Sequence, residues 1–125
     1  MSSTPETVLV VDDDACVRSS LKFILEMEGF QVQLYDSSAA LLADHELPER
    51  GCLVIDYRMP GVDGLELAKR LRAQHVALPI ILISGCIDDQ LRHRAPRSGV
   101  WRVLEKPMLD TSLADSIRQA LAGPA

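Results

Sequence analysis

The chain has 125 residues, of which 47% are hydrophobic and 25% are charged, values typical of one globular domain that can bury a core. Its formal net charge of -5 argues against nucleic acid as the main partner, and no apolar stretch approaches the roughly 18 residues that a membrane span requires. The first residues lack the basic and apolar regions of a signal peptide, and three cysteines without metal-ligand spacing predict reduced thiols in a cytoplasmic protein.

Strand-like and helix-like segments alternate along the chain. Short apolar runs predict strands buried on both faces, and a run that alternates apolar and polar residues predicts a half-exposed second strand. In chain order, the strands are expected at 8–11, 30–35, 52–55, 80–83 and 103–104. Apolar residues at helical spacing predict helices over 15–28, around 41–43, over 65–71 and over 113–121. Gly29 is expected to end the first helix in a left-handed conformation. Asp110 or Thr111 should cap the last helix, which Gly123-Pro124 ends.

Five strand–helix pairs in this order predict an α/β fold, a right-handed, three-layer, doubly wound (βα)5 sandwich. In the flavodoxin-like arrangement the parallel sheet has the strand order 2-1-3-4-5, with its switch point between the first and third strands. Ligands of such sheets collect at the carboxyl ends of the strands. The residues that follow the first and third strands should therefore be neighbours at a binding site.

Carboxylates occupy those strand ends. Asp12-Asp13-Asp14 follows the first strand, Asp56 follows the third, and Ser84 and Lys106 follow the fourth and fifth. Clustered carboxylates repel one another unless a cation lies among them, and Mg²⁺ prefers oxygen ligands. An Asp at a strand end can attack a phosphoryl group and form an acyl phosphate, a transfer that depends mainly on positioning and charge neutralisation. The pattern predicts a site for Mg²⁺ and a phosphoryl group, with Lys106 as the second positive charge. The alternative is that each acid only caps a helix or faces solvent, and this is what we expect of Asp14.

Several short motifs also occur in the order in which one protein family carries them. They are Val10-Val11-Asp12-Asp13, Asp56 within Ile-Asp-Tyr-Arg-Met-Pro-Gly, Gly64-Leu65-Glu66-Leu67, Ser84-Gly85 and Lys106-Pro107. By this ordered set the chain resembles, over essentially its whole length, the receiver domains of two-component response regulators, in the CheY-like superfamily. Its Val-Arg-Ser-Ser-Leu, Tyr-Arg-Met-Pro-Gly and Leu-Glu-Lys-Pro segments are most similar to the FixJ-like subfamily.

The resemblance implies roles for the acids. Asp56 is the expected phosphoacceptor. Asp13 and Asp56, with the main-chain carbonyl of Arg58, are expected to bind Mg²⁺, and Asp12 to act through water.

The resemblance also implies roles at the ends of the fourth and fifth strands. Ser84 would bind the phosphoryl group and swing inward, and Lys106 would pair with that group. The bond between Lys106 and Pro107 is cis in the family. Cys86 stands two residues after Ser84, where family members tune hydrolysis of the phosphoryl group; the alternative is a small, partly buried thiol.

The chain departs from the family before Lys106. The family usually has an aromatic residue three positions earlier, where this chain has Val103, and the nearby aromatic is Trp101. Alternation along a strand would put 101 and 103 on one face, so Trp101 could act as the switch aromatic; the alternative is that it only covers the sheet edge. The fourth helix should lie at 91–97, but few apolar residues support it, and Pro96 is expected to break or kink it.

Four arginines predict a basic face in this region of an acidic protein: Arg92, Arg94, Arg97 and Arg102. FixJ-like receivers use this face, formed by the fourth helix and the fifth strand, to dimerise or to contact an output domain. It is either a solvated run of charge or a partner surface that recognises something acidic.

The favoured function is a switch in a two-component phosphorelay. A sensor histidine kinase or a histidine phosphotransfer protein would donate a phosphoryl group to Asp56. The added charge would bias the face of the fourth helix and fifth strand towards a downstream protein target or an output domain on another chain, with homodimerisation through that face as a further option. No direct nucleic-acid or membrane partner is expected.

The alternative function is an aspartyl-nucleophile phosphohydrolase. HAD-type phosphatases place a general-acid Asp two residues after the nucleophile, where this chain has Arg58. We therefore expect that the protein is not an enzyme and that it removes its own phosphoryl group slowly at most. A single receiver domain is expected over residues 1–125, with no output domain.

Overall fold

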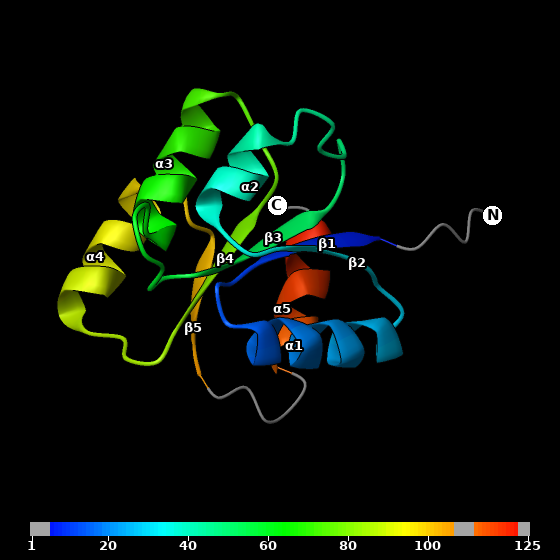
Figure 1. Ribbon diagram of the computed structural model, residues 1–125. Helices are drawn as coiled ribbons and strands as arrows, with labels where there is room; N and C mark the ends of the chain where they lie inside the picture. Colours follow the sequence, from blue (N-terminus) through cyan, green and yellow to red (C-terminus); the bar gives the residue numbers. More distant parts are fainter. Residues whose placement is uncertain (1–5, 107–111, 123–125) are drawn as a thin grey trace.

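The computed structural model describes residues 6–106 and 112–122, in which five parallel strands and five helices alternate (Figure 1). The strand order β2-β1-β3-β4-β5 confirms the predicted doubly wound sheet. The strands are β1 (Thr7–Val11), β2 (Gln31–Tyr35), β3 (Cys52–Asp56), β4 (Ile80–Ser84) and β5 (Arg102–Glu105). The helices are α1 (Ala15–Met27), α2 (Ser38–Ala43), α3 (Gly64–Ala73), α4 (Asp89–Arg97) and α5 (Ser112–Leu121).

The helices cover both faces of the sheet, with α2, α3 and α4 on one side and α1 and α5 on the other (Figure 1). The core is correspondingly split into two clusters, one on each face. Every residue of β3 and β4 is buried, and so is β1 from Val8 onward, because these strands lie in the middle of the sheet. The outer strands β2 and β5 are partly exposed, so the expected two-sided burial of 103–104 is incomplete.

Local capping sets where the helices begin and end. The Asp14 side chain accepts hydrogen bonds from the main-chain N–H groups of Cys16 and Val17, which confirms its role as a cap. Gly29 has a φ of +94°, so the expected left-handed residue after α1 is confirmed. The predictions for Pro107, Asp110, Thr111, Gly123 and Pro124 lie outside the described residues.

The expected break at Pro96 is wrong, because α4 continues to Arg97. Proline lies in the last turn of the helix, where it removes the hydrogen bond to the Arg92 carbonyl and leaves the preceding turns intact. Two buried residues, Leu91 and Ala95, anchor the helix to the sheet. Burying a leucine side chain contributes about 1.5–3 kcal/mol, so a short helix needs few such contacts. Among the described residues, no helix has the length and hydropathy needed to cross a membrane.

Candidate functional site: an acidic cluster at the sheet switch point

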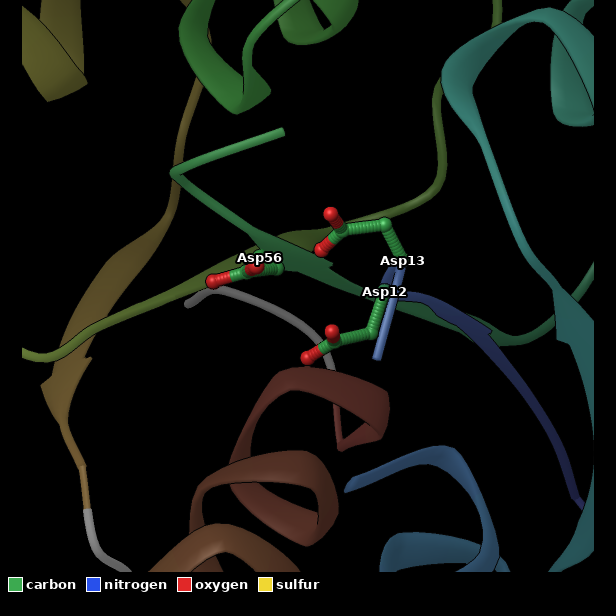
Figure 2. A group of neighbouring side chains, drawn as sticks. All are labelled: Asp12, Asp13 and Asp56. Carbon is green, nitrogen blue, oxygen red and sulfur yellow. The ribbon is translucent and has the colours of Figure 1, made fainter. Parts of the chain in front are cut away.

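Three carboxylates converge where β1 and β3 end. The two strands pair in parallel with Val11 beside Ile55, so the residues that follow, Asp12 and Asp56, emerge at the same edge of the sheet. Asp13 reaches the same place, and one oxygen of each carboxylate lies within 4.8 Å of the others (Figure 2). Asp12 and Asp56 are buried, whereas Asp13 is exposed. The predicted neighbourhood of these acids is confirmed.

Lys106 brings a positive charge into this cluster from the end of β5. Its Nζ lies 3.1 Å from Oδ1 of Asp56 and 3.4 Å from Oδ2 of Asp12. The main-chain N–H of Lys106 donates to the carbonyl of Ser84, which ties this residue to the end of β4. Lys106 is 50 residues from Asp56 in sequence, and the pairing of β4 with β5 brings its side chain to the acids.

The surroundings shift the pKa values of both partners of this ion pair. Burial raises the pKa of Asp56, the hydrogen bond from Lys106 opposes that rise, and repulsion by Asp12 and Asp13 adds to it. Burial alone would lower the pKa of Lys106, but the hydrogen bond to Asp56 and the attraction of Asp12 outweigh it and raise this pKa. These surroundings thus disfavour the negative charge of Asp56 and favour the positive charge of Lys106.

The donor set fits a hard divalent cation. Three carboxylates and one ammonium group leave two negative charges in a space where carboxylate oxygens lie within 4.8 Å of one another. Carboxylate oxygens are ligands that Mg²⁺ prefers, and it keeps several waters in such sites. The exposed position of Asp13 leaves one side of the cluster open to solvent.

Ser84 ends β4 with its side chain fully buried. Its hydroxyl donates to the Cys86 carbonyl at 2.9 Å and accepts from the Cys86 N–H at 3.2 Å. The hydroxyl is therefore engaged by its own loop. Cys86 is exposed, so the alternative of a partly buried thiol there is wrong.

Comparison with known proteins identifies this arrangement. Residues 8–118 match the family model of the response regulator receiver domain. The chain belongs to the receiver domains of two-component response regulators. The chain is 41% identical to the transcriptional regulatory protein FixJ of Bradyrhizobium diazoefficiens, and the match covers 95% of this chain and 58% of that protein. The C4-dicarboxylate transport regulator DctD of Pseudomonas aeruginosa is 40% identical, over 91% of this chain and 25% of the relative.

Solved structures agree with the sequence comparison. The crystal structure of FixJ-N has a TM-score of 0.87 and 36% identity, and the match covers 98% of each chain. A full-length FixJ structure from B. japonicum has a TM-score of 0.85 and 42% identity, over 95% of this chain and 59% of that one. The predicted FixJ-like resemblance is confirmed, and this receiver chain spans somewhat more than half the length of the FixJ proteins that it matches.

One residue that no sequence motif singled out touches the receiver's acidic loop. Arg18, on the first turns of α1, donates from Nη1 to the main-chain carbonyl of Asp12 at 2.6 Å. The main-chain N–H of Asp14 donates to Oδ1 of Asp12 at 2.9 Å, so the peptide and the side chain of Asp12 are both held. The only available signal was the position of an arginine one helical turn beyond the cap, which does not distinguish it from a solvated side chain.

Gly64 is the second residue whose role appears only in three dimensions. A Cβ at this position would lie 2.6 Å from Cδ1 of Leu82 and 2.7 Å from the main-chain oxygen of Asp56. Glycine therefore lets the first turn of α3 pass against the end of β3, and this close approach sets where the Asp56 peptide lies.

The expectation that Trp101 and Val103 share a face is wrong. Trp101 packs with the core on the α1 and α5 side of the sheet, whereas Val103 packs on the α4 side. Alternation does not extend to Trp101 because β5 begins one residue later, at Arg102. Arg102 also lies on the α5 side, over the Trp101 ring and 3.1 Å from the Ser116 hydroxyl, so it does not join the arginines of α4.

Proposed function

We propose that Asp56 is the phosphoacceptor of this receiver, and that its donor is a phosphohistidine of a sensor histidine kinase or of a histidine phosphotransfer protein. In the transfer, a carboxylate oxygen of Asp56 forms a bond to phosphorus while the bond between phosphorus and the donor imidazole nitrogen breaks. The imidazole keeps the electron pair of that bond. The observation that carries the proposal is the position of Asp56 at the switch point, with Lys106 at 3.1 Å and two further carboxylates within 4.8 Å.

Asp12, Asp13 and Asp56 would hold Mg²⁺, together with the main-chain carbonyl of Arg58. When bound, Mg²⁺ neutralises negative charge on the acids and on the phosphoryl oxygens. Lys106 would neutralise part of the same negative charge, because its Nζ already bridges Asp12 and Asp56. Burial of Asp12 and Asp56 strengthens these interactions by excluding water.

Ser84 would carry the state of Asp56 to the rest of the domain. To bind a phosphoryl oxygen, its hydroxyl must leave the Cys86 main chain, and this would move the loop that leads into α4. Val103 is partly buried beside the core on the α4 side, so it is the side chain of β5 placed to follow such a movement. Cys86 would tune the lifetime of the acyl phosphate from its exposed position. Trp101 packs on the opposite side of the sheet and would have no direct part in this step.

The relatives support a wider proposal about the role of this receiver. FixJ and DctD are named transcriptional regulators. By analogy, this receiver would pass its signal by protein contact through α4 and β5, to an output domain or to another protein, with dimerisation through that face as one route. We place it in the cytoplasm as a single receiver unit over residues 1–125, with no more than slow autodephosphorylation.

Phosphorylation by acetyl phosphate with Mg²⁺ tests the proposal, with mass spectrometry of the intact protein as the measurement. The wild type should gain one phosphoryl group, Asp56→Asn should gain none, and a chelator should prevent the reaction. Asp14→Asn is the matched control: it removes a carboxylate from the same loop, yet asparagine still caps α1, so phosphorylation should persist. Phosphorylation of Asp56→Asn at wild-type level would refute the assignment. Repeated rapid turnover of a phosphomonoester would favour the hydrolase instead.

A further inference from the structure

The outer surface of α4 is strongly basic. Its inner side is formed by Leu91 and Ala95, which are buried. The outer side is exposed and carries Arg92, His93, Arg94 and Arg97, which we call the α4 basic surface. It lies on a protein whose formal net charge is -5.

The arginines of the α4 basic surface have no acidic partner among the described residues. Elsewhere among the described residues most basic side chains are engaged, although Arg58 and Lys69 are not. Lys22, Arg50, Arg70, Lys106 and Arg118 each form an ion pair. Arg18 and Arg72 bond main-chain carbonyls. Within residues 6–106 and 112–122, the guanidinium groups of Arg92, Arg94 and Arg97 form neither kind of contact. Their donors are available to another molecule.

Helix stability does not account for this concentration of charge. Arg94 and Arg97 lie in the last turn, where a positive charge interacts favourably with the helix dipole. Arg92 lies outside that turn and gains no such benefit. Arg94 and Arg97 are three residues apart on the helix, so their like charges repel each other. Pro96 removes a further hydrogen bond from the same helix. The charge pattern is better explained by an interaction outside the domain.

We propose that the α4 basic surface binds a protein surface rich in aspartate and glutamate. The guanidinium group presents its N–H donors in a planar fork that matches a carboxylate, so three exposed arginines on one short helix suit a patch of carboxylates. This proposal concerns the partner of α4. It rests on the proposed use of α4 as a contact surface and not on the assignment of Asp56, because it is argued from the exposure and charge of the arginines.

The extent of the surface favours an acidic protein over nucleic acid. Nine residues of helix span only about 13 Å, and α4 begins with two acids, Asp88 and Asp89. A nucleic-acid duplex carries one negative charge per roughly 1.7 Å over a much longer distance, so it would extend beyond the basic surface onto an acidic protein. A compact carboxylate patch on another protein avoids that repulsion.

Binding of a fluorescein-labelled oligoglutamate peptide, long enough to span α4, tests the proposal by fluorescence anisotropy at low salt. The test variant replaces Arg92, Arg94 and Arg97 with Gln. The matched control variant replaces three basic residues that lie away from α4, with the same loss of charge: Lys22, Arg50 and Arg118. Thermal unfolding establishes that each variant is folded. Arg92→Gln alone, in the middle of the helix, provides a milder test.

The wild type and the control should bind the peptide alike, and the α4 variant should bind roughly tenfold more weakly, since exposed ion pairs are individually weak. Arg92→Gln should fall between them, and added salt should weaken the wild type towards the α4 variant. Equal weakening of both triple variants would mean that only net charge matters, and would overturn the proposal. So would failure of the wild type to bind, or tighter binding of a DNA duplex through the same arginines.

Discussion

Replacing Asp56 with asparagine should stabilise the metal-free protein at neutral pH. The change keeps the shape of a buried side chain and removes a charge that its surroundings disfavour, since burial and the neighbouring acids raise the pKa of Asp56. Asparagine can still accept the hydrogen bond from Lys106, which also keeps its contact with Asp12. The substitution therefore removes repulsion while retaining most of the packing.

The magnitude follows from the spacing of the acids. Two unit charges 4.8 Å apart repel by about 1 kcal/mol in bulk water and by about 3 kcal/mol at an effective dielectric constant of about 20. Asp56 faces two such acids, Asp12 and Asp13, which at that dielectric constant repel it by about 6 kcal/mol together, whereas the attraction to Lys106 at 3.1 Å is about 5 kcal/mol. We therefore expect a net stabilisation of about 1 kcal/mol. For a domain of 125 residues that corresponds to an increase in Tm of about 4 °C.

Thermal unfolding with a chelator present measures this effect. The pKa of Asp56 is higher in the folded than in the unfolded protein. The protonated carboxyl therefore contributes its full share of folding stability below the unfolded pKa, and that stability is lost as the pH rises through the folded pKa. The advantage of Asp56→Asn should thus be largest near pH 7 and shrink as the pH falls towards about 4.5. Mg²⁺ should stabilise the wild type more than the variant. Glu105→Gln, at an exposed position, is the control for net charge.

Two results would refute this reasoning. A decrease in Tm of several degrees for Asp56→Asn at neutral pH would mean that the ion pair with Lys106 outweighs burial and repulsion. An increase that is the same at both pH values would mean that the effect does not come from the charge on Asp56.

Three further predictions concern other contacts. Arg18→Ala should weaken Mg²⁺ binding about tenfold by titration calorimetry, because the main chain beside the metal site loses its support, and Arg18→Lys should recover part of that loss. Gly64→Ala should lower the free energy of unfolding in urea by about 1–3 kcal/mol, whereas Gly85→Ala, which faces open space, should change it little. Tyr35→Phe should raise the pKa of Asp44 towards its ordinary value in an NMR titration, because the Tyr35 hydroxyl donates to that carboxylate and holds its pKa down.

Much of the fold was predictable because its signals are local. A run such as Ile80 to Ile83 is apolar at every position, and only a strand covered on both faces satisfies that pattern. Strand direction and connection rules then leave few topologies, so the ends of β1 and β3 had to meet. The acids Asp12, Asp13 and Asp56 could be assigned to one site from the sequence alone, since each lies at the end of a strand or within two residues of it.

The contacts around that site were not predictable in the same way. The side of the sheet on which Trp101 packs depends on where β5 begins. The start of β5 depends in turn on β4, where the Ile80 carbonyl accepts a hydrogen bond from the main-chain N–H of Trp101. The reach of Arg18 to the Asp12 carbonyl depends on how α1 leaves the sheet.

By itself, the sequence determined the order of strands and helices and which carboxylates share the sheet edge, because periodicity and strand-end polarity depend on neighbours along the chain. Only the tertiary structure decided that Lys106 bridges two of those acids, that Arg102 turns towards α5, and that the arginines of α4 have no acidic partner among the described residues. These outcomes depend on distances between elements that are far apart in sequence, and packing of the whole domain sets those distances.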